Sequence, residues 1–313
     1  MISKTLKTAK DKRVGTIERD NRIFYAVIVA FPIIQFCVFY ILVNLNSVLL
    51  AFKKYQYDDG GLYEFVGWEN FSNVFKNLTQ LDYILINLKN SLLLYLFGLL
   101  VGVPVALLFS YYIYKKSIGS KIFKVILFLP SIISSIVMVT IFRYFSERAL
   151  PELINMIFKT QMHGLLENTK TVFPTLVFYS LFIGFGGNVL LYTGAMNTID
   201  DSVVEAAQMD GAGYFRECIS ITIPQIFPTI STFLVVGVAG ILTNEMNLYA
   251  FFGANADTSV STIGYLLFRD TMHGSVSSYP YLAAFGLLLT IVSLPIVMIV
   301  KKILDTVQER LGI

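Results

Sequence analysis

Six long apolar stretches constrain the fold of this chain more than any other feature of its sequence. They lie near residues 24–50, 88–114, 122–145, 172–196, 225–251 and 281–303. A hydrocarbon layer about 30 Å thick needs about 20 apolar residues per helix, and each stretch reaches that length. Because a lipid-exposed segment must satisfy its own backbone hydrogen bonds, all six are predicted to be helices. The sequence therefore predicts an all-α, polytopic membrane protein with six transmembrane helices.

The composition and the first apolar stretch support this interpretation. Of the 313 residues, 55% are hydrophobic and 14% are charged, which is far too apolar for one soluble domain. The run over residues 24–52 is roughly twice as long as the core of a secretory signal peptide, and no small-residue cleavage site follows it. It is predicted to be a membrane anchor behind a basic cytoplasmic tail, residues 1–23.

The basic residues predict the orientation. With the N-terminus in the cytoplasm, six spans return the C-terminal tail, residues 305–313, to the same side. In this arrangement 15 of the 24 Lys and Arg residues lie on the cytoplasmic side, as the positive-inside rule expects. Both termini are therefore predicted to be cytoplasmic.

A polar interruption between the fourth and fifth stretches predicts a short helix. Ser202 and Glu205 have the S-x-x-E spacing of a capping box, and Gly211 is the residue type that most readily closes a helix. A helix of about nine residues is marginal on its own in water, so it needs a surface to pack against. Ala206 and Ala207 are predicted to leave one side flat for another protein. The alternative is an ordinary amphipathic helix that joins two spans.

The same segment carries a family signature. The EAA run at 205–207, Gly211 and the ITIP run at 221–224 resemble the motif EAA-x3-G-x9-I-x-L-P of ABC importer permeases, with Ile223 in place of the usual Leu. The extended run EAAQMDGA, with Asp210 before the glycine, is most similar to the maltose-type sugar permeases. In that family this segment is the coupling helix that docks on the cytoplasmic ATPase. The resemblance thus assigns ATPase coupling to Glu205, Ala206, Ala207, Asp210 and Gly211.

Other blocks extend the resemblance over most of residues 24–304. The run FKVILFLP at 123–130 is similar to the family's entry into the third helix, where Pro130 is expected to kink the span. The run GWENF at 67–71 resembles a segment that packs on the outer surface, or else forms an interfacial aromatic cluster. The resemblance implies the type I ABC importer permease fold over 24–304, with the coupling loop at 197–224.

The resemblance also implies the partners. No G-x4-G-K-[ST] phosphate loop occurs, so the chain is not expected to be an enzyme, and two cytoplasmic ABC ATPase subunits would hydrolyse ATP. An extracytoplasmic solute-binding protein would deliver a sugar, expected to be an oligosaccharide, to a permease in the bacterial cytoplasmic membrane. Six helices make half a pathway, so a second homologous permease is expected, as a heterodimer, with a homodimer left open. No catalytic residue, cofactor, metal or nucleic acid is expected.

The fourth stretch holds the first candidate substrate site. Transporters bind near the bilayer midplane where helices are interrupted, and the run IGFGGN at 183–188 ends in Asn188. Ser180, Phe182 and Gly184 fall at positions that contact sugar in the maltose-type permeases. Of these Gly184 matches, whereas Phe182 replaces a Trp and Ser180 an Asn. The alternative is that the glycines only permit close helix packing.

The fifth stretch supplies a second candidate, Asn244 and Glu245. An ionisable group at membrane depth is by default a functional hypothesis, although Glu245 could also lie near enough to the outer surface to be solvated. The alternative is the same fold with a non-sugar solute such as phosphate, a polyamine or an amino acid. Charged cargo should demand charges of opposite sign inside the membrane, and Glu245 is the only candidate, which argues against anions. A membrane-embedded enzyme or channel is disfavoured because the spans lack the paired Asp, His or Ser/Lys groups of an intramembrane hydrolase.

Overall fold

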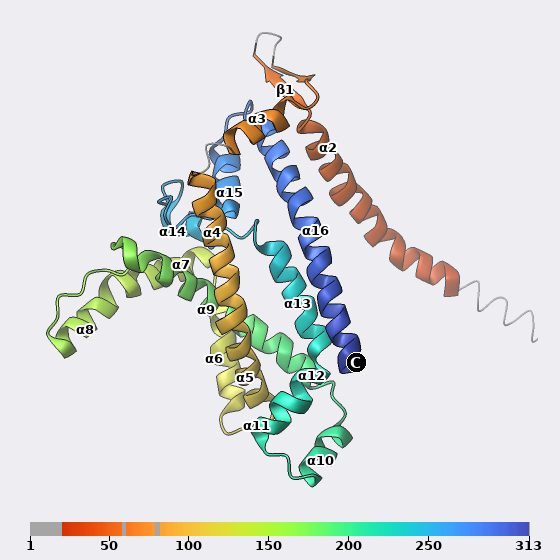
Figure 1. The fold of residues 1–313 in the computed structure, drawn as a ribbon, viewed down its shortest axis with the longest axis vertical. Coiled ribbons are helices and arrows are strands. Elements are labelled where there is room, and N and C mark those ends of the chain that lie inside the picture. Colours follow the sequence, from red (N-terminus) through yellow and green to blue (C-terminus); the bar gives the residue numbers. More distant parts are fainter. Residues whose placement is uncertain (1–20, 58–60, 79–81, 313) are drawn as a thin grey trace, which may run out of the picture.

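The computed structural model describes residues 21–57, 61–78 and 82–312 (Figure 1). Most of the basic tail predicted over 1–23 lies outside these residues. The α-helices in chain order are α2 (Val43–Leu50), α3 (Glu69–Leu78), α4 (Asp82–Phe97), α5 (Val103–Tyr114), α6 (Ser120–Ile132), α7 (Ser135–Tyr144), α8 (Leu150–Phe158), α9 (Thr169–Met196), α10 (Asp201–Met209), α11 (Tyr214–Glu217), α12 (Ile223–Gln225), α13 (Phe227–Gly240), α14 (Leu248–Phe252), α15 (Ile263–His273) and α16 (Tyr279–Leu311). The remaining elements are the π-helical segments η1 (Phe36–Leu42), η2 (Gly98–Gly102), η3 (Phe145–Ala149) and η4 (Cys218–Thr222) and the strands β1 (Lys53–Gln56) and β2 (Leu62–Phe65).

Six crossings can be assigned within the described residues. Four helices are long and apolar enough to cross a membrane unbroken, namely Asn21–Leu50, Tyr83–Tyr114, Thr169–Met196 and Tyr279–Leu311. Two further pairs meet the same test together, namely Ser120–Ile132 with Ser135–Phe158 and Tyr214–Gln225 with Phe227–Gly240. With each bent pair counted as one crossing, every predicted apolar stretch corresponds to one span.

The third span is broken, which corrects the prediction of one kinked helix over 122–145. Pro130 lies inside α6, and the helix continues for only two residues beyond it. Ile133 and Ser134 then take up extended backbone, with ψ of 141° and 136°, and α7 leaves at 104° to α6. The proline removes one hydrogen bond of the helix, but two extended residues make the turn.

The fifth span also differs from its prediction, a continuous helix over 225–251. The long helix of this region, α13, ends at Gly240, and the chain turns through 241–247 before the short α14. Asn244 supports the turn because its Oδ1 accepts the backbone N–H of Met246 at 2.8 Å. Met246 and Asn247 have positive φ of 56° and 53°, which no helix continues through. The span instead begins earlier, in α11, and bends by 68° before α13.

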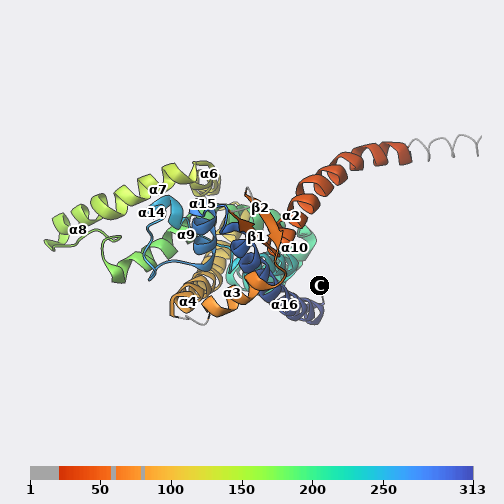
Figure 2. The same cartoon turned by 90° about the horizontal axis from the view of Figure 1, so that it is seen from above.

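The helices form an elongated body with two projections. The apolar window of the first span, Asn21–Leu50, has none of its residues buried. Figures 1 and 2 agree that this span and α8 leave the body in opposite directions. In the body, α5 packs on α9 through the buried Ala106, Val189 and Tyr192. The Ser110 hydroxyl donates to the Val189 carbonyl at 3.1 Å, so this helix pair is joined by polar as well as apolar contacts.

The two strands and α3 cap one end of the body, which we call the hairpin end. β1 and β2 pair antiparallel, and Tyr55 lies across from Tyr63 with ring centroids 5.3 Å apart. In the GWENF run, Asn70 donates to the carbonyl of Lys53 at 2.7 Å, and Phe71 is buried beside Ala284 of α16. Trp68 stays 70% exposed. The run thus combines the two expected properties, because it packs on the body and also presents an aromatic ring.

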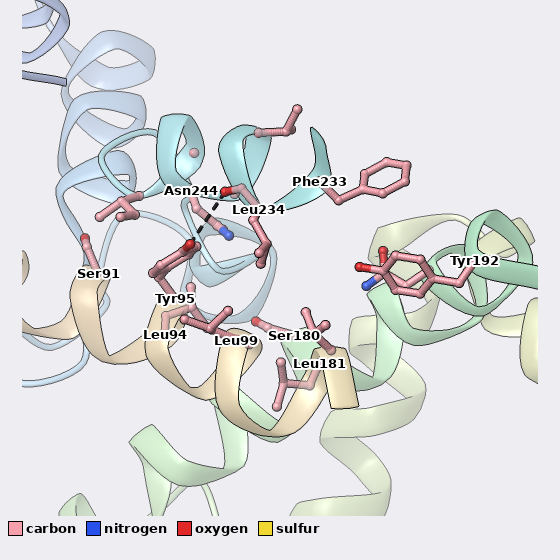
Figure 3. Close-up of a pocket in the computed structure, with 17 residues that line it drawn as sticks. Ser91, Leu94, Tyr95, Leu99, Ser180, Leu181, Tyr192, Phe233, Leu234 and Asn244 are labelled. Atoms are coloured by element: carbon pink, nitrogen blue, oxygen red, sulfur yellow. Dashed lines mark hydrogen bonds between the residues drawn. The ribbon is translucent and has the colours of Figure 1, made fainter. Parts of the chain in front are cut away.

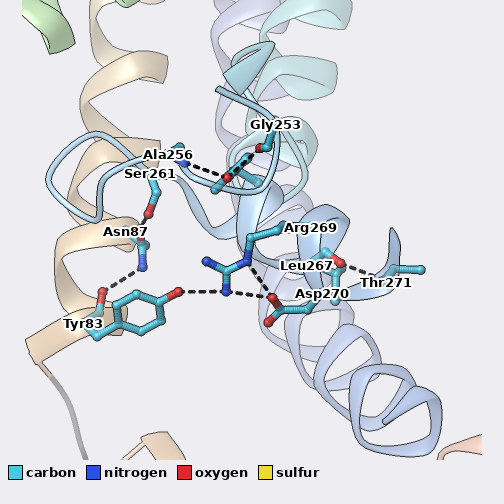
Figure 4. Close-up of polar contacts among 10 residues, drawn as sticks. Tyr83, Asn87, Gly253, Ala256, Ser261, Leu267, Arg269, Asp270 and Thr271 are labelled. Carbon is cyan, nitrogen blue, oxygen red and sulfur yellow. Dashed lines mark hydrogen bonds and ion pairs between the residues drawn. The ribbon is translucent and has the colours of Figure 1, made fainter. Parts of the chain in front are cut away.

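At the hairpin end, buried polar groups of α4 clamp the loop before α15 (Figure 4). Asn87 is hydrogen bonded to the Ser261 hydroxyl, and Asn90 donates to the carbonyls of Ser259 and Ser261, both at 2.9 Å. Further out, an Arg269 N–H donates to the Tyr83 hydroxyl at 3.4 Å. The bonds from Asn90 satisfy backbone carbonyls of the loop that would otherwise be unpaired. They hold α4 and the loop together.

Candidate functional site

Helix α10 lies at the end of the body opposite the hairpin, which we call the α10 end (Figure 1). It starts differently from the prediction, since its N-cap is Asp200 rather than Ser202. The Asp200 Oδ1 accepts the backbone N–H of Ser202 at 2.9 Å. That backbone hydrogen bond lowers the pKa of the Asp200 carboxyl, which keeps it a charged acceptor. The carboxylate at this position also meets the positive end of the helix dipole, which adds to its stabilisation of the helix start.

The end of α10 agrees with the prediction. Gly211 has a φ of +80° and follows Asp210, the exposed C-cap residue. The backbone N–H groups of Gly211 and Ala212 donate to the carbonyls of Gln208 and Ala207, both at 3.0 Å. These are the bonds of a helix closed by a left-handed residue, so the length of α10 is fixed by its glycine.

The two alanines of α10 do not share one free side, which corrects the prediction. Ala207 is only 8% exposed and faces the body together with the buried Val204, whereas Ala206 and Glu205 are exposed. Residues three apart lie on one face of a helix, and neighbours lie about 100° apart. The outer face of α10 therefore presents Glu205, Ala206 and Met209, the last with 88% of its surface exposed.

A cavity of about 410 Å³ lies among the α4–η2–α5 span, α9 and α13 (Figure 3). Its size falls within the usual range of small-molecule sites. It is lined by Ser91, Leu94, Tyr95, Gly98, Leu99, Val103, Ser180, Leu181, Asn188, Tyr192, Phe233, Leu234, Val236, Gly237, Gly240, Ile241 and Asn244. The lining residues of the α4–η2–α5 span and of α9 lie well inside the spans Tyr83–Tyr114 and Thr169–Met196, so this part of the cavity is at membrane depth.

Three of the predicted substrate residues line this cavity, namely Ser180, Asn188 and Asn244. The Ser180 hydroxyl is buried and has no hydrogen-bond partner within the part of the chain that the structure describes. An orphaned hydroxyl in a cavity wall is a group that a ligand can satisfy. The two candidate sites, one in the fourth stretch and one in the fifth, therefore contribute to one cavity.

The other three predicted substrate residues lie outside the cavity. Phe182 is 39% exposed, and its ring stacks on Phe178 with centroids 6.3 Å apart. Gly184 lies on the same face of α9 as Ser180 and Asn188, but it has no side chain to reach the cavity and is not among the lining residues. Glu245 follows Asn244 in the turn after α13 but is not part of the lining, and its Oε2 is buried without a partner among the described residues.

The glycines of α9 serve different purposes. A Cβ at Gly186 would overlap the backbone carbonyl of Leu127 in α6, with its carbon only 2.7 Å away, whereas one at Gly187 would meet nothing within 4 Å. The packing alternative is therefore correct for Gly186. Close approach of two backbones needs a residue without a side chain.

Several lining residues were missed by the sequence analysis, above all Tyr95, Gly98 and Leu99 on the second span. The Tyr95 hydroxyl donates to the Leu234 carbonyl at 3.5 Å and bridges α4 to α13. Gly98 and Leu99 begin η2, a π-helical segment bounded by two glycines. Such segments are frequent at functional sites. The GLLVG run was the available signal, since it interrupts an apolar span with glycine as the fourth stretch does.

Comparisons with known proteins agree with this architecture. Residues 96–310 match the family model described as "Binding-protein-dependent transport system inner membrane component". Protein LplB of Bacillus subtilis (strain 168) is 25% identical over 288 residues, which cover 90% of this chain and 87% of LplB. The arabinooligosaccharides transport system permease protein AraP of the same organism is 25% identical over 277 residues, 87% of this chain and 85% of AraP.

A solved structure shares the fold. A chain of a bacterial alginate ABC transporter, crystallised with an alginate pentasaccharide-bound periplasmic protein, superposes with a TM-score of 0.74 at 22% identity, over 93% of this chain and 97% of that chain. The predicted type I ABC importer permease fold and the predicted family resemblance are thereby confirmed. The chain belongs to the family of inner membrane components of binding-protein-dependent transport systems.

Proposed function

We propose that this chain is a permease subunit of an ATP-driven importer for a sugar, and within that class for an oligosaccharide. The observation that carries the proposal is the chemistry of the cavity. Its polar groups are hydroxyls and amides, including Ser180, Asn188 and Asn244, and none of its described lining residues is charged. Neutral donors and acceptors suit the hydroxyls of a sugar, and the rings of Tyr95, Tyr192 and Phe233 suit its apolar faces. A charged solute would be left without a counter-charge.

Helix α10 is proposed to be the contact with the ATPase. It is short, it projects at the α10 end, and its outer face and glycine end are exposed. Physically, ATP can shift the permease between inward- and outward-facing states only through a contact whose free energy differs between the two states. The α10 face with Glu205, Ala206, Asp210 and Gly211 is the proposed contact.

The exposure of the first span supports a proposed assembly with a second permease. The first span buries none of its apolar window against the described chain, which leaves room for a second, homologous permease beside it. We propose a heterodimer of permeases with two cytoplasmic ATPase subunits and an extracytoplasmic solute-binding protein. The complex would lie in the bacterial cytoplasmic membrane, with both termini on the ATPase side.

Replacement of Asn188 by alanine is expected to raise the KM for uptake about tenfold, because the cavity loses one hydrogen-bonding partner of the solute. Replacement of Phe182 by alanine is the matched control on the same helix. It is expected to leave the KM within about twofold, because its ring stacks on Phe178 outside the cavity. Initial uptake rates over a range of solute concentrations measure both. The reverse pattern would place the solute on the Phe178–Phe182 face.

The proposed function is tested by uptake of labelled solutes. Cells with and without the gene are given oligosaccharides, monosaccharides, phosphate, polyamines and amino acids, with the Gly211→Asp variant as the uncoupled control. A loss confined to one oligosaccharide would support the sugar importer and identify its solute. A loss of a non-sugar would retain the fold and overturn the substrate class.

A further inference from the structure

A buried carboxylate joins three helices at the α10 end. Glu217 of α11 has 1% of its side chain exposed, and its Oε1 lies 2.8 Å from the Lys115 Nζ. The Tyr111 hydroxyl donates to the same oxygen at 3.0 Å. The other oxygen, Oε2, accepts from the Gln208 Nε2 at 3.1 Å. Both oxygens are thus occupied, by groups from α5, from the residue after it and from α10.

The cation of this group is also largely enclosed. The Lys115 side chain is 15% exposed, and its Nζ lies 5.6 Å from the ring centre of Tyr214 and 5.9 Å from that of Tyr114. Charges taken out of water are tolerated only when partners and hydrogen bonds compensate them, and loss of one partner leaves the other buried and unpaired. The network is therefore stable in one arrangement of α5, α10 and α11.

This arrangement connects α10 to both walls of the cavity. One wall, α9, leads into α10 through the short connection at 197–200. The other wall, the α4–η2–α5 span, is far from α10 along the chain. Tyr111 lies in the last turn of α5, and Lys115 is the residue after that helix. Residues 91–103 of that span line the cavity, and helix carries the intervening residues from 103 to 114. A displacement of α10 can therefore reach both walls, provided that the ion pair is intact.

We propose that Lys115 and Glu217 are positioning residues that make the α4–α5 span move with α10 when ATP is bound. The proposal rests on the proposed function, in which α10 contacts the ATPase. A solely structural ion pair would affect only the amount of folded complex. A mechanical link affects how strongly ATP changes the cavity in complexes that are fully assembled. The two roles therefore differ in a measurable quantity.

The test measures the cavity directly and needs no known solute. The complex is purified through a tag on this chain, with both native cysteines replaced, Cys37→Ser and Cys218→Ala, and a reporter Leu99→Cys in the cavity wall, and is reconstituted into lipid vesicles. The rate at which a membrane-impermeant maleimide labels the reporter thiol is measured with and without Mg-ATP plus vanadate. The reporter complex without further changes is expected to alter its labelling rate about tenfold on addition of ATP.

The Glu217→Gln variant is expected to retain the ATPase subunits and to hydrolyse ATP, while ATP changes its labelling rate by less than about twofold. The charge-swapped variant Lys115→Glu with Glu217→Lys is expected to recover at least half of the response. Gln208→Met removes only the hydrogen bond from α10 to Glu217 and leaves the ion pair in place. ATP is expected to change its labelling rate by an intermediate amount. Glu309→Gln, an acid-to-amide change at the exposed end of α16, is the matched control and should respond fully.

The outcomes separate the link from the proposed function. If no ATPase copurifies with the unchanged chain, the proposed function fails. If ATPase copurifies and Glu217→Gln responds to ATP as fully as the control, the link alone is overturned. If Glu217→Gln does not assemble, Gln208→Met decides the matter, since a full response there would overturn the link and a reduced response would support it.

Discussion

The Gly211→Asp variant is expected to insert into the membrane in normal amounts and to lose uptake by about 100-fold or more. Gly211 closes α10 with a φ of +80°, and a Cβ at this position meets nothing within 4 Å. Aspartate is among the residues that tolerate left-handed backbone, so the chain can still fold. The new carboxylate, however, lies on the proposed docking face. Covering it with a partner leaves a desolvated, unpaired charge, which costs several kcal/mol and accounts for the size of the loss.

The matched control is Gly211→Asn, which has the same shape and no charge and also tolerates positive φ. It is expected to keep at least about a tenth of the uptake, because the remaining strain is small. Uptake rates are compared at equal amounts of membrane-inserted chain, measured by immunoblot of the membrane fraction. If Gly211→Asp still supports unchanged uptake, α10 is not the coupling contact.

The Gly186→Ala variant is expected to be destabilised by about 1–3 kcal/mol, as for an overpacked core. A single added methyl would lie 2.7 Å from the backbone carbon of Leu127. The overlapping atoms belong to the main chain of α6, so no side-chain rotation relieves the contact, and α6 and α9 must separate. The melting temperature of the purified protein in detergent should fall accordingly.

Gly187→Ala is the control for this effect, one residue along the same helix. Its Cβ meets nothing within 4 Å, and alanine is favoured over glycine in a helix by about 0.5–1 kcal/mol. Its melting temperature is therefore expected to stay the same or rise. Equal losses in both variants would show that the effect comes from α9 itself and not from its contact with α6.

The sequence predicted helices and helix ends well where the responsible residues are neighbours along the chain. Among the described residues, apolar runs long enough to span a bilayer identified the four unbroken spans and indicated the two bent ones, and the EAA run with Gly211 identified a short helix and its end. Its start was misplaced because Asp200 and Ser202 are both good caps, and the choice between them depends on where the chain leaves α9. The break at 133–134 was also missed, because Ile and Ser carry no strong signal against helix.

The substrate site was predicted only in part, because it depends on helix rotation. Ser180 and Phe182 are two positions apart and both suit a sugar, yet only the first faces the cavity. The sequence contains the composition of each helix but not its rotation in the bundle, which is set by packing such as Gly186 against Leu127. The aromatic wall residue Tyr95 was missed for the same reason.

By itself, then, the sequence determined that the chain is a helical membrane protein with a short helix closed by Gly211, because the length of apolar runs and helix caps are local properties. The resemblance of the EAA run added the permease family. Only the tertiary structure decided that Ser180, Asn188 and Asn244 share one cavity and that Phe182 does not. It alone paired Lys115 with Glu217, which are 102 positions apart. A buried charge finds its partner through the packing of helices, and no spacing along the chain records that packing.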